Sequence, residues 1–379
     1  MTTGGKKILF LMQVIGHPRD SKRIKMLQDA GYHVDAAAFE RDYRGGRPPS
    51  CGVAILGKLQ HGKYFLRLFK FLKAVPAIRS ALARCDVVYA SGQDMAFLAF
   101  ISGIGLGKPI AMEVGDLVRL QVRSGLRGNL VRTVDRWITA QYKLLVVISE
   151  GFLDVYYRKW LRLATPGLVI QNKLEWAQSN QKSRESPGRS NGVRPLAGRP
   201  LKIGYFGLLR DAWSWQVLNG LVRTHPARFE VVFAGLPIVP PDLAEQVANT
   251  PGLTYLGEYR SPERLPEIYD AVDMIWACYP AMDEDDWNMR WGRPNRFYES
   301  CYFRKPCFAR AGSLFASDVE RYEIGSVIDM EDVQETIEFI AKIGVEDYEL
   351  WCLSMSALPP ETYLYTNERK LLSSAIENL

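Results

Sequence analysis

The segment EVGDL at 113–117 places two carboxylates at the end of PIAMEV, an apolar run typical of a strand buried on both faces. The carboxyl end of a parallel strand is where such sheets bind ligands, and a carboxylate there can take a proton from an attacking hydroxyl. Asp116 is therefore a candidate general base. The alternative is that Asp116 only caps the N-terminus of the next helix.

A second candidate site follows the first apolar run, in the turn VIGHPRDSKR at 14–23. Gly16 allows close approach of a ligand to the backbone, and basic side chains surround the start of a helix. These side chains are His17, Arg19, Lys22 and Arg23. They are consistent with an anion or diphosphate site, or with solvated charge at a helix start.

The most informative motif is RPNRFYESCYFRKP at 293–306. Pro294 suits the first position of a helix, and Glu299 lies one turn inside it. A helix N-terminus beside Arg296 is a natural diphosphate site, and Glu299 can bind ribose hydroxyls. Earlier, LKIGYFGLLR at 201–210 places Gly207 at a junction of strand and loop, next to Arg210.

Several other chemistries are disfavoured. GIGLGK at 103–108 lacks the spacing of a phosphate-binding loop, and no GxGxxG follows the first strand of a nicotinamide-binding fold. The six cysteines form no CxxC pair and the four histidines are far apart, which disfavours a metal site. The acidic run at 283–286 is interpreted as a solvated loop, or as a contact to sugar hydroxyls.

The net charge of +6 is unevenly distributed. Residues 1–150 hold 23 Lys or Arg and 11 Asp or Glu, whereas the remainder holds 25 and 31. From Tyr43 to Cys85 there are nine basic residues and no acidic one, and the helical stretch within this segment is also apolar. We expect the basic segment 44–84 to contact an anionic membrane surface, although a helix packed on its own sheet shows the same pattern. No nucleic-acid partner is expected, because no RNA-binding module accompanies the charge.

The elements that must position these residues alternate between apolar strands and helices over the whole chain of 379 residues. This alternation predicts an α/β protein with two tandem Rossmann-like, doubly wound domains and an interdomain cleft. The predicted parts are a first domain at 1–174, a polar linker at 175–200, a second domain at 201–360, and a C-terminal helix at 361–379 that packs back on the first domain.

The second half resembles the donor-binding half of GT-B glycosyltransferases. In that family a strand ending in Tyr-x-Gly and a segment Pro-Asn-Lys-x-Tyr-Glu bind the nucleotide sugar, and this chain has Tyr205-Phe-Gly and PNRFYE at 294–299. The order of motifs agrees over about 8–365. The resemblance implies a nucleotide-diphosphate sugar as donor, with a UDP-sugar favoured, and no metal or other cofactor. The donor site that it implies consists of Gly207, Arg210, Tyr279, Arg293, Asn295, Arg296 and Glu299.

Two departures from the family pattern bear on mechanism. Retaining members of family four carry two glutamates, but here only Glu299 matches and Trp291 occupies the first position. Asp116 instead resembles the aspartate proposed as base in inverting, membrane-associated GT-B enzymes such as bacterial exopolysaccharide glucuronosyltransferases. Inversion with Asp116 as base is therefore predicted. The alternatives are a retaining mechanism, a sugar-nucleotide 2-epimerase, and an inactive nucleotide-sugar-binding partner subunit.

The resemblance also implies the acceptor and the cellular location. The acceptor is expected to be a lipid-linked sugar or glycan in bacterial polysaccharide or glycolipid assembly, bound by the basic first domain. The predicted acceptor-binding residues are His17, Arg19, Glu113 and Arg119. The protein is expected to be cytoplasmic and peripheral at the inner face of the plasma membrane.

Overall fold

The structure is a computed structural model that describes residues 5–40, 48–58, 64–175, 198–278 and 286–379. The chain forms two compact units. The first is Met1–Asn172 together with Asn367–Leu379, and the second is Lys173–Thr366. Each unit is built on one parallel sheet with helices on both faces, as the alternation of the sequence predicts.

The sheet of the first unit has seven strands in the order β3-β2-β1-β4-β5-β6-β7. Its central strands are buried almost throughout and mainly apolar because both faces of the sheet are covered. The strands are β1 (Lys7–Met12), β2 (His33–Glu40), β3 (Val53–Lys58), β4 (Val87–Ser91), β5 (Ile110–Val114), β6 (Leu144–Val147) and β7 (Gly167–Val169). β1 and β4 pair from Ile8↔Val87 to Leu11↔Ala90, and these neighbours mark the point at which the strand order reverses. Ligands of doubly wound sheets bind at the carboxyl ends of the strands at this point.

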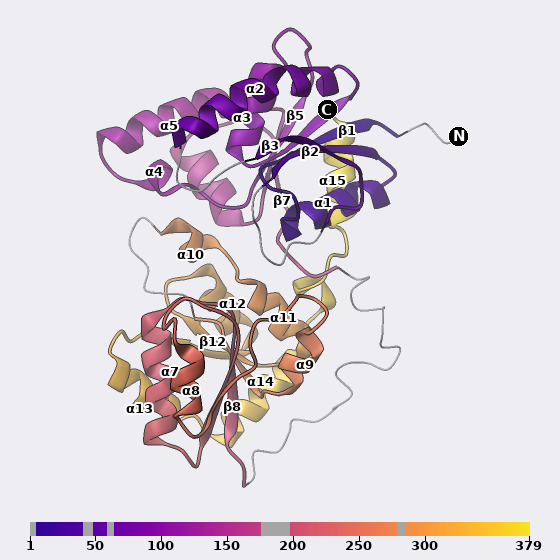
Figure 1. Cartoon of the computed structure of the whole chain (residues 1–379). Helices are drawn as coiled ribbons and strands as arrows, with labels where there is room; N and C mark the ends of the chain where they lie inside the picture. The colour runs from indigo at the N-terminus through magenta and orange to yellow at the C-terminus, as the bar shows by residue number, and fades with distance from the viewer. Residues whose placement is uncertain (1–4, 41–47, 59–63, 176–197, 279–285) are drawn as a thin grey trace. The chain divides into compact units, whose positions relative to one another are not determined.

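The helices of the first unit lie on both faces of this sheet (Figure 1). They are α1 (Pro18–Asp29), α2 (Tyr64–Leu82), α3 (Gln93–Ser102), α4 (Arg119–Val122), α5 (Leu126–Thr139), the π-helix η1 (Phe152–Trp160) and α15 (Glu368–Glu377). The sequence patterns above predicted a helix after Asp116 only as an alternative and without bounds, so the extents of α4 and α5 come from the structure. No described helix is long and apolar enough to cross a membrane.

The last helix of the chain, α15, packs against α1 in the first unit. Lys6 Nζ donates to the carbonyl oxygens of Ile376 and Glu377 at 3.2 and 2.9 Å. The hydroxyl of Tyr32 donates to Glu377 Oε1 at 2.6 Å, and burial together with this carboxylate raises the pKa of Tyr32 to about 12. The end of the chain is therefore part of the first unit.

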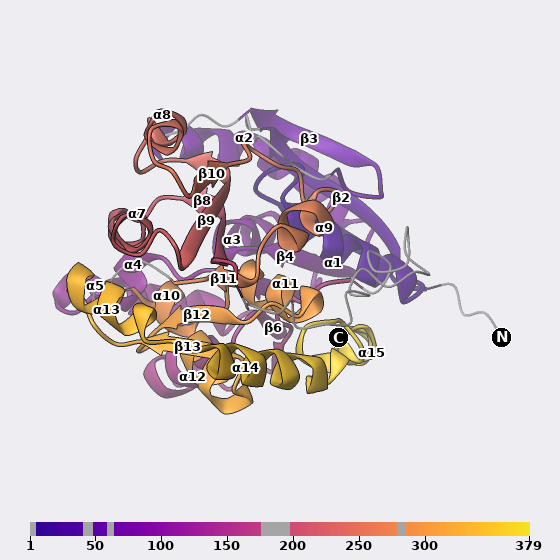
Figure 2. The ribbon, with the colours of Figure 1, turned by 90° about the horizontal axis from the view of Figure 1, so that it is seen from below.

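The sheet of the second unit has six strands in the order β10-β9-β8-β11-β12-β13, with its reversal point between β8 and β11. The strands are β8 (Leu201–Leu209), β9 (Phe229–Pro237), β10 (Leu253–Tyr255), β11 (Met274–Trp276), β12 (Cys307–Arg310) and β13 (Gly325–Ile328). The helices are α7 (Ala212–Thr224), α8 (Leu243–Ala248), α9 (Leu265–Asp270), α10 (Trp287–Trp291), α11 (Asn295–Phe303), α12 (Leu314–Tyr322), α13 (Val333–Ala341), α14 (Val345–Ala357) and the 3-10 turn η2 (Pro360–Thr362). Figure 2 shows α7 and α8 on one side of the sheet and α9 and α11 on the other.

The boundary between the units differs from the predicted linker at 175–200, most of which lies outside the described residues. The second unit begins at Lys173, because Leu174 pairs with the segment before α15. Its amide donates to Tyr363 O at 2.9 Å, and Tyr365 N donates to Leu174 O at 3.0 Å. The two chain segments that join the units thus run side by side within the second unit, which also includes 361–366.

Candidate functional site

A buried ion pair lies beneath the reversal point of the first sheet. Glu113, at the end of β5, is fully buried and receives two hydrogen bonds from Arg23 of α1, Nε–Oε2 at 2.9 Å and Nη2–Oε1 at 3.0 Å. The hydroxyl of Tyr89 donates to Oε2 at 2.5 Å. Burial by itself would raise the pKa of Glu113, but the charge and hydrogen bonds of Arg23 outweigh it and lower that pKa below its ordinary value.

This burial corrects the prediction that Glu113 binds the acceptor. Its carboxylate has no exposed surface and is held by Arg23 and Tyr89. The sequence placed Glu113 near the end of a strand but could not show which face its side chain is on, because side chains alternate between the two faces of a strand. In the structure, Glu113 lies on the face that α1 covers with Arg23. Glu113 therefore acts as a buried anchor for the neighbouring cations.

Arg19 lies near Glu113, in a position that is possible only because residue 115 is a glycine. Its Nε is 3.7 Å from Glu113 Oε1, and its guanidinium lies against the α-carbon of Gly115. A methyl group at position 115 would meet Arg19 Nη1 at 1.3 Å, which is far inside contact distance. The glycine before Asp116 thus makes room for the Arg19 side chain.

His17 occupies the N-cap position of α1, directly after β1. Burial lowers the pKa of His17, and the charge of Arg19 adds to this effect, whereas the carboxylates of Asp20, Asp116 and Glu113 oppose it. The lowered pKa favours the neutral imidazole, which can take part in hydrogen bonding or proton transfer.

Asp20 is buried below His17, with its Oδ1 3.7 Å from His17 Nδ1. The Ser91 hydroxyl, at the end of β4, donates to the same oxygen at 2.6 Å. Burial raises the pKa of Asp20. The carboxyl ends of β1, β4 and β5 are thereby joined through one polar cluster.

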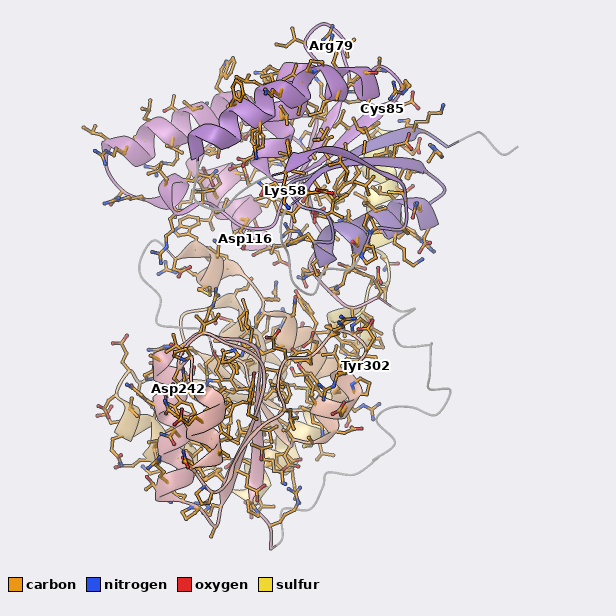
Figure 3. All side chains as sticks on the ribbon, in the orientation of Figure 1. Lys58, Arg79, Cys85, Asp116, Asp242 and Tyr302 are labelled. Atoms are coloured by element: carbon orange, nitrogen blue, oxygen red, sulfur yellow. The ribbon has the colours of Figure 1, made fainter. Side chains whose placement is uncertain are left out.

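Asp116 differs from these neighbours because it is exposed, in the loop between β5 and α4 (Figure 3). The N-cap of α4 is Val118, whose amide donates to Gln121 Oε1 at 2.7 Å. Val118, and not Asp116, is therefore the N-cap residue of α4. The structure brings His17, Arg19 and Asp116 together, whereas Arg119 is exposed on the first turn of α4.

In the second unit, β8 and β9 meet through two glycines at their carboxyl ends. Gly207 pairs with Gly235, and a methyl group on Gly235 would meet Gly207 O at 1.9 Å. Gly207 itself has a φ of +103°, which favours glycine, and no atom lies within 4 Å of the place of a Cβ. Arg210 follows, exposed, one residue beyond the strand.

The motif at 293–306 forms the loop before α11 and the helix itself. Pro294 is the N-cap, and not the first helical residue as predicted. Arg296 Nη1 donates to Trp276 O at 2.9 Å, at the end of β11, and its Cζ lies 5.1 Å from the centre of the Tyr205 ring. Asn295 is exposed in the same turn.

Glu299 and Arg293 are more enclosed than the motif suggests. Glu299 is buried and accepts a hydrogen bond from the Tyr269 hydroxyl at 2.9 Å. Arg293 pairs through Nε and Nη2 with both carboxylate oxygens of Asp318, which ties the loop before α11 to α12. Arg293 thus has a structural contact in the predicted donor site. Tyr279 lies outside the described residues.

A further cation, Arg310, was not predicted. It ends β12, is 7% exposed, and its Cζ lies 4.2 Å above the ring of Trp213. Its Nη2 is 3.8 Å from Glu331 Oε1, and its buried Nη1 has no hydrogen-bond partner among the residues that the structure describes. The sequence signal was a charge at the end of the short apolar strand CFAR.

The charges of Arg296 and Arg310 both act on Cys278. Burial raises the pKa of Cys278, two residues beyond β11, and the charges of Arg296 and Arg310 act against that rise. Arg296 thus contacts the carboxyl end of β11, and Arg310 ends the adjacent strand β12, close to the reversal point of the sheet. Such an arrangement suits a ligand with more than one negative charge.

No family model matches the chain. The succinoglycan biosynthesis protein ExoL of Rhizobium meliloti is 30% identical over 371 residues, which are 95% of this chain and 90% of ExoL. The chain belongs to the ExoL family.

The solved structures that resemble this ExoL-family protein are GT-B glycosyltransferases. Anabaena HepE in complex with UDP and glucose matches with a TM-score of 0.70 and 14% identity, over 99% of this chain and 100% of HepE. WaaG, a glycosyltransferase involved in lipopolysaccharide biosynthesis, matches with a TM-score of 0.65 and 12% identity, over 97% and 98%. The predicted fold is confirmed, and the names of these similar proteins agree with the predicted class, a glycosyltransferase of exopolysaccharide biosynthesis.

No metal centre accompanies this fold in the part of the chain that the structure describes. No group of three or more His, Cys, Asp or Glu side chains there is arranged to hold a metal ion. The cations near the reversal point of the second sheet are arginines. In the ExoL-family protein, protein side chains are thus available to hold an anionic ligand.

Proposed function

We propose that the protein transfers a sugar from a nucleotide-diphosphate sugar, preferably a UDP-sugar, to a lipid-linked or glycan acceptor during exopolysaccharide assembly. The observation that carries this proposal is the pair of arginines, Arg296 and Arg310, at the carboxyl ends of the adjacent strands β11 and β12. A diphosphate would neutralise both cations and supply acceptor atoms for buried Arg310 Nη1, which has none among the described residues. Solved complexes of HepE with UDP and with UDP-glucose support this choice of donor.

The donor site also includes the backbone at Gly207, the side chains of Arg210 and Asn295, and Glu299 for the ribose. Gly207 has open space where a side chain would stand, so a ligand can approach its backbone closely. Arg293 holds the loop before α11 through Asp318 and so acts as a positioning residue. Tyr279, outside the described residues, stays a prediction. The proposal requires no metal.

The acceptor is held by the first unit, at the cluster of His17, Arg19 and Asp116. Arg19 offers a positive charge for a phosphate of the acceptor, and neutral His17 offers a hydrogen bond. Arg119 follows on the next element. Among these groups, Asp116 combines exposure with a carboxylate, which is what a general base for an acceptor hydroxyl needs.

The reaction then proceeds in one displacement. Asp116 takes the proton of the acceptor hydroxyl while the oxygen attacks the anomeric carbon of the donor sugar. The bond from that carbon to the diphosphate breaks, and the leaving nucleoside diphosphate carries away the electron pair. Arg296 and Arg310 stabilise the charge that develops on it, which is commonly the largest catalytic effect. Attack from the side opposite to the leaving group inverts the anomeric configuration.

The lipid-linked acceptor places the protein at the cytoplasmic face of the plasma membrane, where the basic segment 44–84 binds anionic lipid. Part of this segment lies outside the described residues. In the described part, Phe69 and Leu72 of α2 are exposed beside Lys73, whose Nζ lies 4.6 Å from the centre of the Phe69 ring. Arg79, by contrast, donates to the carbonyl oxygens of Ser102 and Ile104.

One observation favours a second candidate, an inactive subunit that only binds the nucleotide sugar. Trp291, at the end of α10, occupies the place of the first family-four glutamate. If the protein were a retaining enzyme, it would lack the first of the two glutamates of that family. An inverting enzyme with Asp116 as base does not need that glutamate.

Turnover with a panel of UDP-, GDP- and dTDP-sugars, with lipid-linked sugars as acceptors, tests the proposal. We expect release of UDP from one UDP-sugar and a much lower rate with the other nucleotides. Arg296→Ala should weaken UDP binding in a thermal-shift titration without unfolding the protein. Binding of a UDP-sugar without turnover, with acceptors present, would favour the inactive subunit. Unchanged UDP affinity in Arg296→Ala would contradict the donor site.

A further inference from the structure

Helix α5 exposes a stripe of large apolar side chains. Leu126, Leu130, Val134 and Trp137 are 87%, 66%, 48% and 61% exposed. Their spacing of four, four and three residues puts them on one face of a helix. The stripe runs nearly the whole length of α5 (Leu126–Thr139), which is about 20 Å at 1.5 Å per residue.

The opposite face of α5 makes the contacts that attach this helix to the first unit, so the stripe is not the face by which α5 packs on that unit. The carboxylate of Asp135 accepts hydrogen bonds at 2.6 to 3.0 Å from four side chains, namely Gln93, Gln121, Thr139 and Tyr156. Gly128 is in such close contact with the preceding turn that a methyl group would meet Arg123 O at 1.9 Å. These contacts hold α5 in a fixed rotation, with the stripe facing solvent.

The charge around the stripe has one sign. Between 117 and 149 the only acidic residue is Asp135, and its carboxylate points into the hydrogen bonds just described. The basic residues on α4, on α5 and between them are five arginines, Arg119, Arg123, Arg127, Arg132 and Arg136. Of these, Arg132 is held by the carbonyl oxygens of Gln121 and Arg123, at 2.9 and 2.8 Å.

Apolar side chains of α3 extend the exposed apolar surface of α5. The rings of Phe100 and Trp137 meet edge to face with centroids 6.4 Å apart, which places the two helices side by side. Ile104, just beyond α3, is 64% exposed, and Phe97 is partly exposed on the same helix. An apolar face of this size with arginines beside it differs from the scattered single apolar residues of an ordinary surface.

We propose that α5 is a lipid-docking helix, which lies flat on an anionic bilayer with its stripe among the acyl chains and its arginines at the phosphates. Apolar side chains flanked by arginines, with no exposed carboxylate between 117 and 149, match the headgroup region of such a bilayer. This inference rests on the proposed membrane association, but it assigns the contact to an element other than segment 44–84.

The position of α5 in the chain links lipid docking to the chemistry. Helix α4 begins three residues after Asp116, and α4 and α5 pack together as a hairpin. Docking of this hairpin would hold the loop of the candidate base near the surface that presents a lipid-linked acceptor. The proposed base and the lipid contact thus lie on consecutive elements of one unit.

The test uses the full-length protein and vesicles of phosphatidylcholine alone, or of phosphatidylcholine and phosphatidylglycerol in equal parts. The variant Leu126→Gln/Leu130→Gln keeps good helix formers at both positions while it removes the two most exposed side chains of the apolar stripe. The matched control is Leu353→Gln/Leu371→Gln, in which leucines that are 65% and 50% exposed are changed on α14 and α15. Thermal unfolding and UDP binding of each variant show whether the fold and the donor site are intact.

We expect the wild-type protein to co-sediment with the anionic vesicles and much less with the neutral ones. The α5 variant should bind the anionic vesicles at least tenfold more weakly, and the control should bind like the wild type. Arg127→Gln/Arg136→Gln should reduce the preference for anionic lipid and its dependence on salt. A dye attached at Leu130→Cys should report an apolar environment on vesicles, whereas a dye at Leu353→Cys should not.

Other outcomes separate this inference from the proposed function. If the α5 variant binds like the wild type while Lys70→Gln/Lys73→Gln does not bind, the lipid contact lies in segment 44–84 and our inference is wrong. If the wild type self-associates through α5 instead of binding lipid there, our inference is wrong. If the wild type binds no vesicle at all, both membrane proposals are wrong. UDP release with a lipid-linked acceptor dispersed in detergent tests the transferase proposal independently of vesicle binding, because no bilayer is present.

Discussion

Arg23 of α1 and Glu113 of β5 form a fully buried ion pair, 90 residues apart in the sequence, with two hydrogen bonds of 2.9 and 3.0 Å. The pair connects the helix that carries His17 and Arg19 to the strand that leads to Asp116. It therefore fixes the two halves of the candidate acceptor site relative to each other.

Replacement of Glu113 by Gln should destabilise the first unit. The change leaves the buried Arg23 guanidinium without a counter-charge, and breaking one side of such a pair costs about 3–5 kcal/mol. Chemical denaturation measures this loss, with Glu267→Gln, at an exposed pair with Arg264, as the control. A loss below about 1 kcal/mol would show that Arg23 finds another partner.

The same pair should make stability depend on pH. Because folding lowers the pKa of Glu113, its contribution is present above the pKa of the unfolded chain and is lost as pH falls through the folded pKa. The wild type should therefore lose stability in acid more steeply than Glu113→Gln. Denaturation midpoints between neutral pH and about pH 3 test this, and parallel curves for the two proteins would contradict it.

Gly115→Ala should disturb the acceptor site without unfolding the protein. The new methyl group would occupy the place of Arg19 Nη1, so the guanidinium must leave its present position near Glu113. A displacement of about 1 Å at a reacting site can cost about 10²-fold in rate. Gly52→Ala is the control, because no atom lies within 4 Å of its added carbon. Equal acceptor KM and kcat in both variants would show that Arg19 is not needed.

Asp116→Asn should lower kcat by about 10²–10⁴-fold, because asparagine keeps the size of the side chain but cannot take a proton. UDP affinity should not change, since Asp116 belongs to the other unit from the donor site. An α-linked sugar nucleotide should give a β-linked product, which NMR couplings of the product report. A fully active variant, or a product of retained configuration, would favour the retaining mechanism.

Arg310→Met should have opposite effects on binding and on stability. The loss of a charged hydrogen bond to the diphosphate, worth about 1.5–3 kcal/mol, should weaken UDP binding by about 10–100-fold. Without UDP, the variant should be as stable as the wild type or more so, because Nη1 is buried without a partner among the described residues. Strong destabilisation with unchanged UDP affinity would assign Arg310 a structural role instead.

The sequence alone was sufficient for the architecture and the family. Runs such as 8–12 are apolar at every position because parallel strands are covered on both faces, and this signal does not depend on the rest of the chain. The motif at 294–299 is also local, because a helix start, a cation and a carboxylate lie within six residues. Local patterns of this kind were enough to predict the two doubly wound sheets, whereas the nucleotide-sugar site at 294–299 stays a prediction.

The tertiary structure decided which of the predicted polar residues are accessible. Glu113 and Asp116 are three positions apart, yet one is buried against Arg23 and the other is exposed, and only the packing of α1 on the sheet separates them. Little in the sequence indicated a role for Arg310. Arg296 contacts the end of β11 and Arg310 ends β12, and only the pairing of these two strands in the sheet makes them neighbours. The stripe on α5 likewise has the pattern of any amphipathic helix, and the hydrogen bonds of Asp135 determine that its apolar face points outward. Sequence periodicity shows that a helix has two faces, but only the partners of each face determine which one is buried.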